Sequence, residues 1–400
     1  CECPSGAVRF GSDIRWAFAT LAAPQSTLPC TVESFNRSDP AINARKECWC
    51  LQSRTRGSTP LAKARVGIVM VSRRPPDLVR WLRYHVGYMG ADHVYIQLED
   101  SPDLAENASL WRSLPKSILT RTTVWRSHPS PALSSEPSDG RPADDYDTLQ
   151  ARQLRAMRRA KDAARDMGLD WIIHIDDDEL LHAPWHRPLG EILAAVAPPF
   201  NQVDIPNVEA IYDGPKIKDC FAETTKVNLN RFKFASYANG KAAARLHLSA
   251  NHRAAMDDVT DEEGYDIEPA GPHQWRMGDG EDILSVHLDE EPFGAPLMVI
   301  HFESCPLARW EDKFWELGNT SPERVAHIPF GFYRESIRRM QACKGRVPAG
   351  KGENDDEDCS QEAFERFWSS WKTRANKKLK VGDLMDIRIP WDSVSTGSND

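Results

Sequence analysis

Four consecutive acidic side chains, Asp176 to Glu179, form the group in this sequence whose chemistry is easiest to interpret. They directly follow Trp171 to Ile175, a short apolar run typical of a strand buried on both faces of a parallel sheet. Adjacent carboxylates repel one another, and a divalent cation is their usual counter-charge because hard cations prefer carboxylate oxygens. Ligands in open α/β sheets bind beyond the carboxyl ends of the strands. We therefore interpret the run as a metal site, with a solvated acidic turn as the alternative.

The stretch that ends in Glu179 resembles the W-hydrophobic-D-x-D-E signature of metal-dependent glycosyltransferases with the GT-A fold, closest to the family 2-like and family 92 groups. In those enzymes the first and third acids bind a Mn²⁺ ion that bridges the diphosphate of the donor. The resemblance implies that Asp176 and Asp178 bind Mn²⁺ or Mg²⁺, with Asp177 among the residues near the donor. It also implies a nucleotide-sugar donor, most simply a UDP-sugar. Leu180 departs from the Phe that is frequent in the family.

A second buried strand should supply the third metal ligand. Residues 297–300 are apolar and lead to His301. GT-A enzymes often complete the metal site with a late histidine, for which His301 is our first choice and His273 our second. Functional residues of different strands meet at one edge of a sheet. If the first strand stays extended through its acids, Asp176 and Asp178 point to the same side, and the middle acid points away.

A strand, a helix and a strand follow one another near the start of the resembling region, over Val66–Val71, Asp77–Met89 and His93–Leu98. This order is typical of a βαβ unit with a parallel strand pair. His85 lies on the apolar face of the helix, where a hydrogen-bonded core histidine is expected rather than a ligand. The unit resembles the opening segment of the family at Trp81, Tyr84, His85, Gly90, His93 and Ser101.

Two departures from the family fall near the expected nucleotide base. Arg73 and Arg74 stand near its Asn-Glu pair, and Leu98 and Glu99 stand at its Asp-Asn pair. We name Arg73, Glu99 and Asp100 as candidates for donor binding. The arginines could neutralise a diphosphate, or they could be an ordinary pair of surface arginines.

The resemblance implies three further residues near the donor. Gln153 lies inside the apolar stripe of a helix predicted over Tyr146–Met167, where the family has a glutamine that faces the site; a glutamine at the solvated end of the helix is the alternative. Lys241 belongs to a segment that resembles G-K-x-x-x-R and would approach the donor phosphates, unless it is a surface lysine. His273 lies in a turn that resembles G-x-H.

An inverting transfer, as in the resembling families, needs a carboxylate that deprotonates the acceptor hydroxyl. Glu209 and Asp213 lie in an extended segment over residues 203–214, in what the family uses as the acceptor half. Glu303 follows the strand of His301. These three are our candidates for the catalytic base, without a ranking.

The elements together predict an α/β fold of the GT-A type, which is Rossmann-like, with a mixed, mostly parallel central sheet flanked by helices. We place the catalytic domain at 63–345, after a cysteine-rich leader over 1–62 that shows no periodicity. Residues 346–400 should form a flexible acidic loop, a short helix and a tail. We also expect a mobile loop over 127–147, a strand over 119–125 and a loop insertion over 256–270.

Nine cysteines indicate the compartment. The crowding of cysteines in the leader favours disulfides over zinc or free thiols, because a segment with a poor hydrophobic core needs covalent cross-links for stability. Cys343 and Cys359 could bridge the acidic loop. Three N-x-S/T triplets, at Asn36, Asn107 and Asn319, fit the N-glycosylation pattern. Together with the cysteines they favour the secretory pathway, in the Golgi lumen or outside the cell. The leader cysteines are Cys1, Cys3, Cys30, Cys48 and Cys50.

The charge balance argues against nucleic acid as a partner. The net charge is −9 and no long run of Lys and Arg occurs, whereas a nucleic-acid binder shows a basic face. No apolar run approaches the ~20 residues that cross a bilayer, so membrane contact would need an anchor preceding Cys1. The expected partners are a nucleotide-sugar and a glycan or glycoconjugate acceptor.

Three functions fit the pattern. The first is a glycosyltransferase. The second is a non-catalytic carbohydrate-binding or scaffolding protein that keeps the fold, since fold does not secure function. The third is a metal-dependent phosphohydrolase.

Overall fold

The structure is a computed structural model that describes the larger part of the chain. For residues before 53, for 108 and 127, and for 145–148 it gives the backbone alone. The described residues are 6–12, 15–20, 47–52, 63–75, 77–99, 101, 108–127, 145–183, 187–196, 200–247, 266–278, 280, 283–288, 297–344, 359–373, 379–380, 383–387, 389, 391 and 394.

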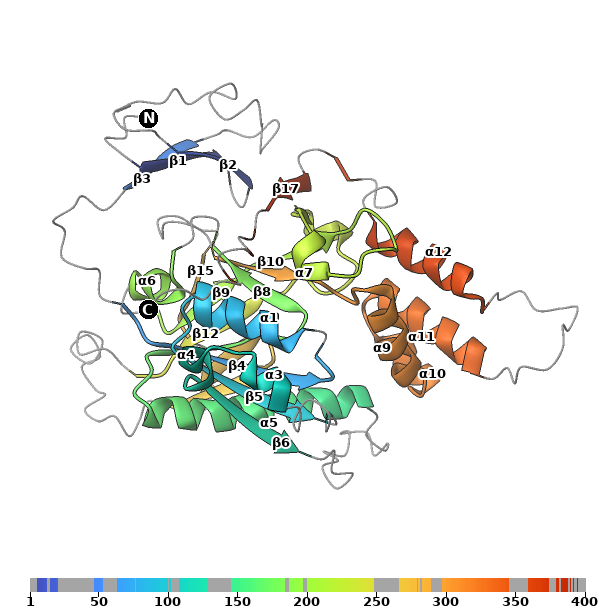
Figure 1. The fold of residues 1–400 in the computed structure, drawn as a ribbon, viewed down its shortest axis with the longest axis horizontal. Coiled ribbons are helices and arrows are strands. Elements are labelled where there is room, and N and C mark those ends of the chain that lie inside the picture. The colour runs from blue at the N-terminus through green and yellow to red at the C-terminus, as the bar shows by residue number, and fades with distance from the viewer. Residues whose placement is uncertain are drawn as a thin grey trace, which may run out of the picture.

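A seven-stranded mixed sheet forms the centre of the fold (Figure 1). Four neighbouring pairs are parallel, and the two pairs made by β12 are antiparallel. In spatial order the strands are β15 (Ser285–His287), β9 (Gln202–Ile205), β12 (Lys241–Arg245), β7 (Trp171–His174), β4 (Val66–Arg73), β5 (His93–Glu99) and β6 (Thr122–Ser127). The predicted α/β class, with a mixed and mostly parallel sheet, is confirmed.

Both faces of this sheet are covered. Alternate residues of β4 point to opposite faces. Ile68 and Met70 pack with Trp81 of helix α1 (Leu78–Leu82), whereas Val69 belongs to a second core with the long helix α5 (Asp145–Asp166). Figure 1 shows α5 running along the lower edge of the molecule, opposite α1. Coverage of both faces explains why these strands are apolar without alternation.

The predicted βαβ unit is present. Asp77 caps α1 by accepting a hydrogen bond from the Arg80 N–H, and the helix continues as a π-helix, η2 (Arg83–Tyr88). Gly90 then adopts a φ of 73°, which favours glycine, and the chain enters β5.

A five-stranded sheet lies beside the first and carries the other half of the site. In its centre β10 and β16 are parallel, and β16 pairs with β8 in antiparallel fashion, which sets His301 opposite Glu179. In spatial order its strands are β17 (Leu384–Asp386), β11 (Lys226–Asn228), β10 (Asn207–Ile211), β16 (Met298–His301) and β8 (Glu179–His182).

Helices after β16 gather at one end of the molecule, on the right in Figure 1. They pack around Trp310, which touches Phe364 and Phe367. The predicted Cys343–Cys359 disulfide is present. These helices are α9 (Leu307–Leu317), α10 (Pro322–His327), α11 (Gly331–Lys344) and α12 (Gln361–Lys372). The shorter helices elsewhere are α3 (Ala108–Arg112), α4 (Lys116–Leu119), α6 (Leu189–Ala194), α7 (Cys220–Glu223) and η3 (Arg231–Lys233).

Three expectations about local structure need correction. The leader is not irregular, because its described backbone forms an antiparallel sheet. The strand expected from residue 119 begins at 122, because α4 occupies the residues just before it. The expected loop over 256–270 ends in a strand, β13, which pairs with β14. The strands concerned are β1 (Gly6–Ser12), β2 (Arg15–Thr20), β3 (Glu47–Gln52), β13 (Ile267–Gly271) and β14 (Gln274–Met277).

Two predictions fall outside what the structure describes. They are the disulfides among the leader cysteines and the mobile loop, of which residues 128–144 are not described. In the described part of the chain, no helix has both the length and the apolar character needed to cross a bilayer.

Candidate functional site

A cleft of about 810 Å³ opens where β4, β7 and β16 end. One side is formed by the end of β4 and by α5 side chains between Leu149 and Gln153. The other side is formed by α7, α9 and the turn before α11. The acids of the Asp176–Glu179 run lie between the two sides. This is the sheet edge at which α/β folds bind their ligands.

The acidic run forms a turn rather than an extension of the strand. β7 ends at His174, and the Glu179 N–H donates to the Asp176 carbonyl at 3.2 Å. The Glu179 carboxylate accepts from the Asp176 N–H at 2.8 Å. The Trp81 indole N–H reaches the carbonyls of both residues, at 3.1 and 3.0 Å. The extended conformation that would aim Asp176 and Asp178 to the same side therefore does not persist.

Asp176 lies in a cluster with a buried lysine. Lys241 Nζ is 2.5 Å from Asp176 Oδ2 and 3.2 Å from Glu179 Oε2, and Gln153 Nε2 donates to Asp176 Oδ1 at 3.0 Å. The Tyr237 hydroxyl donates to the other Glu179 oxygen. Burial alone would raise the pKa of Asp176, but the Lys241 ammonium lowers it well below its usual range. We call Asp176, Glu179, Tyr237 and Lys241 the lysine cluster.

Asp177 turns to a different cation. Arg309 Nη2, from the first turn of α9, lies 3.0 Å from each Asp177 carboxylate oxygen, and the Ser72 hydroxyl donates to Oδ2. Burial raises the pKa of Asp177, and the Arg309 guanidinium opposes that shift. The second terminal nitrogen of Arg309 donates to the Arg74 carbonyl at 2.6 Å. Arg309 thus joins α9, the end of β4 and the acidic turn.

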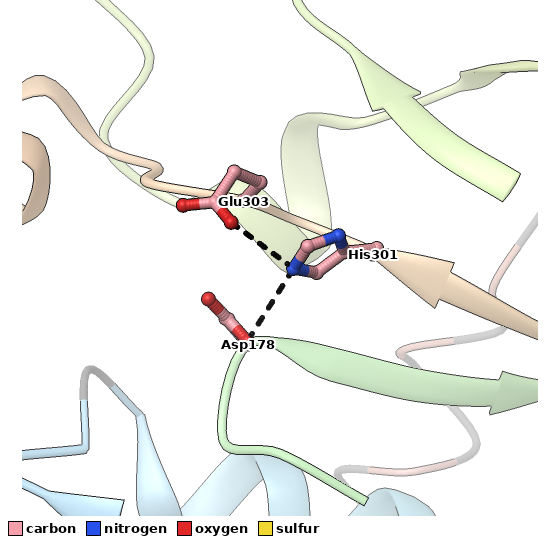
Figure 2. A group of neighbouring side chains, drawn as sticks. All are labelled: Asp178, His301 and Glu303. Carbon is pink, nitrogen blue, oxygen red and sulfur yellow. Dashed lines mark ion pairs between the residues drawn. The ribbon is translucent and has the colours of Figure 1, made fainter. Parts of the chain in front are cut away.

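Asp178 meets His301 and Glu303 (Figure 2). His301 Nε2 is 3.8 Å from Asp178 Oδ1 and 3.5 Å from Glu303 Oε2, and the three ligand atoms lie within 4.8 Å of one another. The antiparallel β16–β8 pair brings them together, because Asp178 precedes β8 and its carbonyl accepts from the Phe302 N–H at 2.8 Å. We call Asp178, His301 and Glu303 the histidine cluster.

The histidine cluster fits a divalent cation. Ser236 Oγ lies 3.2 Å from His301 Nδ1. When Nδ1 donates to that hydroxyl, the Nε2 lone pair faces two carboxylates, so the centre of the cluster is lined by acceptors alone. Carboxylate oxygens suit Mn²⁺ and Mg²⁺, and imidazole binds other first-row divalent metals, so the set fits a first-row divalent cation. The residues present could therefore hold a divalent cation, and the predicted metal stays a prediction.

Glu303 is held as an anion. Lys313 Nζ donates to its Oε1 at 2.8 Å, and the Tyr333 hydroxyl donates to Oε2 at 2.7 Å. Burial would raise the pKa of Glu303, but Lys313 and His301 bring it well below its usual range. A strongly depressed pKa suits a metal ligand better than a general base.

The other two candidate bases lie away from the cleft. Glu209 is buried in the second sheet, where Oε1 accepts from the Ala235 N–H at 2.8 Å. Asp213 is exposed, beyond the end of β10. Neither residue lines the cleft.

Most of the residues named for donor binding line the cleft, but Lys241 is buried and does not. Those that line it are Arg73, Glu99, Gln153, Asp177 and His273. Arg73 and Arg74 both pair with Glu316, at 3.0 and 3.2 Å. Glu99 accepts from Arg152 Nε at 2.7 Å, and Gln153 faces the acidic turn instead of the solvated end of its helix. Asp100 is outside the described residues.

Two histidines have neutral rings because they are buried. His273 lines the cleft with Nδ1 2.7 Å from the Gly240 carbonyl, and burial together with Lys241 lowers its pKa to about 3. His85 is a core residue, as expected. Its Nε2 accepts from the Leu181 N–H at 3.2 Å, so its Nδ1–H donates to the Trp81 carbonyl at 3.0 Å.

The sequence did not single out Arg309, Lys313, Tyr333 or Phe330, all of which line the cleft. A signal for Arg309 exists. A helix that directly follows a site strand begins at the site edge of the sheet, so basic residues in its first turns face the site. The positions of Tyr333 and Phe330 depend on how α11 packs, which no local pattern gives.

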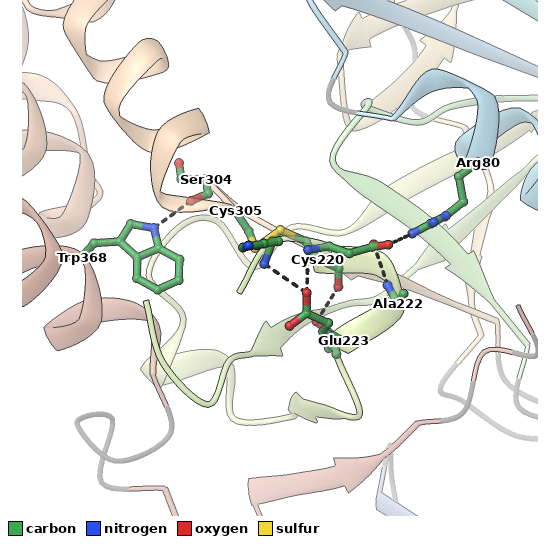
Figure 3. The surroundings of a disulfide bond; sticks show 10 residues. Arg80, Cys220, Ala222, Glu223, Ser304, Cys305 and Trp368 are labelled. Carbon is green, nitrogen blue, oxygen red and sulfur yellow. Dashed lines mark hydrogen bonds and ion pairs between the residues drawn. A yellow bond between two sulfur atoms is a disulfide. The ribbon is translucent and has the colours of Figure 1, made fainter. Parts of the chain in front are cut away.

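A disulfide closes one wall of the cleft (Figure 3). Cys220 at the start of α7 is joined to Cys305, two residues after Glu303. On one side the Trp368 indole N–H donates to the Ser304 carbonyl at 2.8 Å, and on the other Arg80 pairs with Asp219. The chain after the histidine cluster is therefore fixed from both sides.

Two Arabidopsis thaliana proteins, both named glycosyltransferase-like, are similar to part of this chain. One is 34% identical over an alignment of 128 residues, covering 26% of this chain and 28% of that protein. The other is 31% identical over 127 residues, covering 26% of this chain and 25% of that protein. The alignments thus span about a quarter of the length of these relatives. No model of a known protein family matches the sequence. Over the aligned stretch, the similarity supports a relationship to glycosyltransferase-like proteins.

Proposed function

We propose that this protein is a metal-dependent glycosyltransferase that moves a sugar from a nucleotide-sugar, most simply a UDP-sugar, to a hydroxyl of a glycan or glycoconjugate. The observation that carries the proposal is the histidine cluster at the floor of a cleft, at the sheet edge where α/β folds bind nucleotides. The glycosyltransferase-like names of the two relatives support the same reaction class.

One side of the cleft suits the donor. Asp178, His301 and Glu303 would hold Mn²⁺, which supplies Lewis-acid stabilisation of the charge on the leaving diphosphate. Arg73 and Arg74 stand at the end of β4 with Glu316 between them. An arriving diphosphate could replace Glu316 as their partner, because guanidinium groups bind phosphate in the same forked geometry as carboxylate.

The opposite side suits a sugar acceptor. Phe330 and Tyr333 line it, with ring centroids 5.9 Å apart, and Tyr237 lies 6.5 Å from Phe330. Aromatic rings of this kind give an apolar surface with a polar edge, which matches the apolar face and hydroxyl rim of a pyranose. Substrate would therefore bridge the aromatic wall and the metal cluster.

The described disulfides fit a compartment that keeps cysteines oxidised. We propose the lumen of the secretory pathway, or the cell exterior, as the place of action.

Release of nucleotide from a panel of sugar nucleotides, with and without Mn²⁺ and a mixture of glycan acceptors, tests the function. We expect acceptor-stimulated release that requires Mn²⁺ and is lost in Asp178→Asn. Asp213→Asn is the matched control, because Asp213 is exposed and outside the cleft. Carbohydrate binding without nucleotide release from any donor would contradict the proposal and favour the non-catalytic alternative.

A further inference from the structure

The three consecutive aspartates of the acidic turn have three different kinds of partner. Asp176 faces a lysine, Asp177 faces an arginine, and Asp178 faces a histidine and another carboxylate. Because these neighbouring aspartates have different partners, we expect them to have different roles in the site.

Both carboxylate oxygens of Asp176 are already engaged. Gln153 donates to Oδ1, and Lys241 donates to Oδ2. The Lys241 side chain is fully shielded from solvent, and a buried ammonium is stable only when it is paired. A metal ion at Asp176 would have to bind beside the ammonium of Lys241, which repels it. Displacing Lys241 would leave its charge buried with Glu179 alone. Glu303 also has a lysine, Lys313, but that lysine binds Oε1, while Oε2 faces His301.

Asp177 is engaged to the same extent. Arg309 is 3.0 Å from both of its oxygens, and Ser72 adds a hydroxyl donor. Arg309 also donates to the carbonyls of Arg73 and Arg74, at 3.3 and 2.6 Å, so its guanidinium is fixed in place independently of Asp177.

Asp178 differs from both. Within the described ranges, no lysine or arginine forms an ion pair with its carboxylate, and His301 Nε2 lies 3.8 Å from its Oδ1. Its carbonyl is fixed to β16 by the Phe302 N–H, which holds the residue against the histidine cluster.

We infer that Lys241 and Arg309 are positioning residues that neutralise the first two aspartates, so that Asp178 alone of the run binds the divalent cation, together with His301 and Glu303. The inference rests on the proposed metal site, but it departs from the two-aspartate ligand set that the D-x-D resemblance implies. It also gives Lys241 a structural task in place of a contact with the donor phosphates.

Charge-balanced double variants separate the two ligand sets. Asp176→Asn with Lys241→Met removes one carboxylate and its own cation, and Asp177→Asn with Arg309→Gln does the same for the second pair. In each double variant the net charge of the site is unchanged. A change in metal affinity would therefore indicate a lost ligand rather than a change in the electrostatic potential at the site. Asp178→Asn has no such compensating partner.

Binding of Mn²⁺ alone, without nucleotide, can be followed by the loss of the free-ion paramagnetic resonance signal. We expect both double variants to bind Mn²⁺ within about 3-fold of the wild-type affinity, and Asp178→Asn to bind on the order of 100-fold more weakly. The single variant Lys241→Met should bind Mn²⁺ at least as tightly as the wild type, because it exposes an uncompensated carboxylate beside the site.

A loss of affinity in the Asp176–Lys241 double variant as large as that in Asp178→Asn would overturn the inference and restore the two-aspartate set. Far-ultraviolet dichroism and a melting curve confirm that each variant folds. A wild-type protein that binds no Mn²⁺ would overturn it as well. If Mn²⁺ binds in the expected pattern but no donor is cleaved, the inference stands and the proposed function fails, so the two failures differ.

Discussion

The lysine cluster and the histidine cluster share the acidic turn, since Asp178 lies between Asp176 and Glu179 in the sequence, yet their carboxylates have different partners. In the lysine cluster the ammonium of Lys241 lies between the carboxylates of Asp176 and Glu179. In the histidine cluster the atoms that face the centre are two carboxylate oxygens and an imidazole nitrogen. The first cluster holds its cation between its two carboxylates, whereas the lysine of the second, Lys313, binds Oε1 of Glu303, and Oε2 faces His301.

This difference shows how a run of buried acids can be divided between stability and binding. A buried carboxylate with its own cation contributes to the fold, because removing either partner leaves a charge without compensation. Asp178, which forms no ion pair with a lysine or arginine of the described residues, favours a metal ion. The identity of the residue does not distinguish the two cases, since Asp176 and Asp178 are the same amino acid on the same turn.

The largest expected effect comes from breaking the histidine cluster. His301→Gln removes the imidazole that faces both carboxylates, and we expect Mn²⁺ affinity to fall on the order of 100-fold, with loss of transfer. Calorimetric titration with Mn²⁺ measures the effect. The control is His287→Gln, because His287 is half exposed on β15, away from the cleft. Equal Mn²⁺ affinity in the wild type and His301→Gln would contradict the assignment.

The second prediction concerns the disulfide that follows the histidine cluster. The Cys220–Cys305 bond closes 85 residues, and replacing both cysteines with serine should lower the free energy of unfolding by about 2–4 kcal/mol. Because Cys305 lies two residues after Glu303, Mn²⁺ binding should weaken as well, while the lysine cluster keeps its ion pair. Urea unfolding and Mn²⁺ titration measure the two effects.

The Cys343–Cys359 bond provides the comparison for that experiment. It spans 16 residues and lies away from the cleft, so its removal should cost less stability and leave Mn²⁺ affinity unchanged. An equal loss of Mn²⁺ affinity in both double variants would show that the effect is one of general stability.

The smallest expected effect is a pH dependence beside the lysine cluster. Burial lowers the pKa of His174 to about 4 in the folded protein, against about 6.5 in the unfolded chain. Between these values the unfolded chain binds the proton and the folded protein does not, so stability falls as the pH is lowered through this range. At pH 5 the loss from this residue is at most about 2 kcal/mol.

The variant His174→Asn tests this contribution. The asparagine amide can replace Nδ1, which lies 3.0 Å from the Pro272 carbonyl, but it does not titrate. We expect the free energy of unfolding of the variant to decrease less between pH 7 and pH 5 than that of the wild type. A parallel decrease in both proteins would mean that His174 is protonated in the fold.

The sequence predicted those features that depend on local pattern and on strand ends. The apolar runs around Val66 and Trp171 gave the parallel core, and the rule that strand ends share an edge brought Asp178 near His301. The reason for that contact was not foreseen, because it comes from the antiparallel pairing of β8 with β16. Both strands belong to a second sheet that no local pattern revealed.

The other differences between the sequence-based predictions and the structure depend on contacts between residues far apart in the chain. Asp176 could not be separated from Asp178 without knowing that Lys241 is buried beside it, 65 positions later. The sequence alone leaves Glu303 as a candidate base, because its partners Lys313 and Tyr333 come from helices whose packing cannot be predicted from a local pattern. The leader strands were missed because small and polar residues interrupt their apolar alternation.

The central claim is that one cation binds at the histidine cluster, and anomalous X-ray scattering from crystals soaked in Mn²⁺ tests it most directly. Data collected above the manganese absorption edge locate the ion without assuming any ligand. We expect a single strong peak within bonding distance of Asp178, His301 and Glu303, with Lys241 still between Asp176 and Glu179. A peak coordinated by Asp176, with Lys241 displaced, would contradict it.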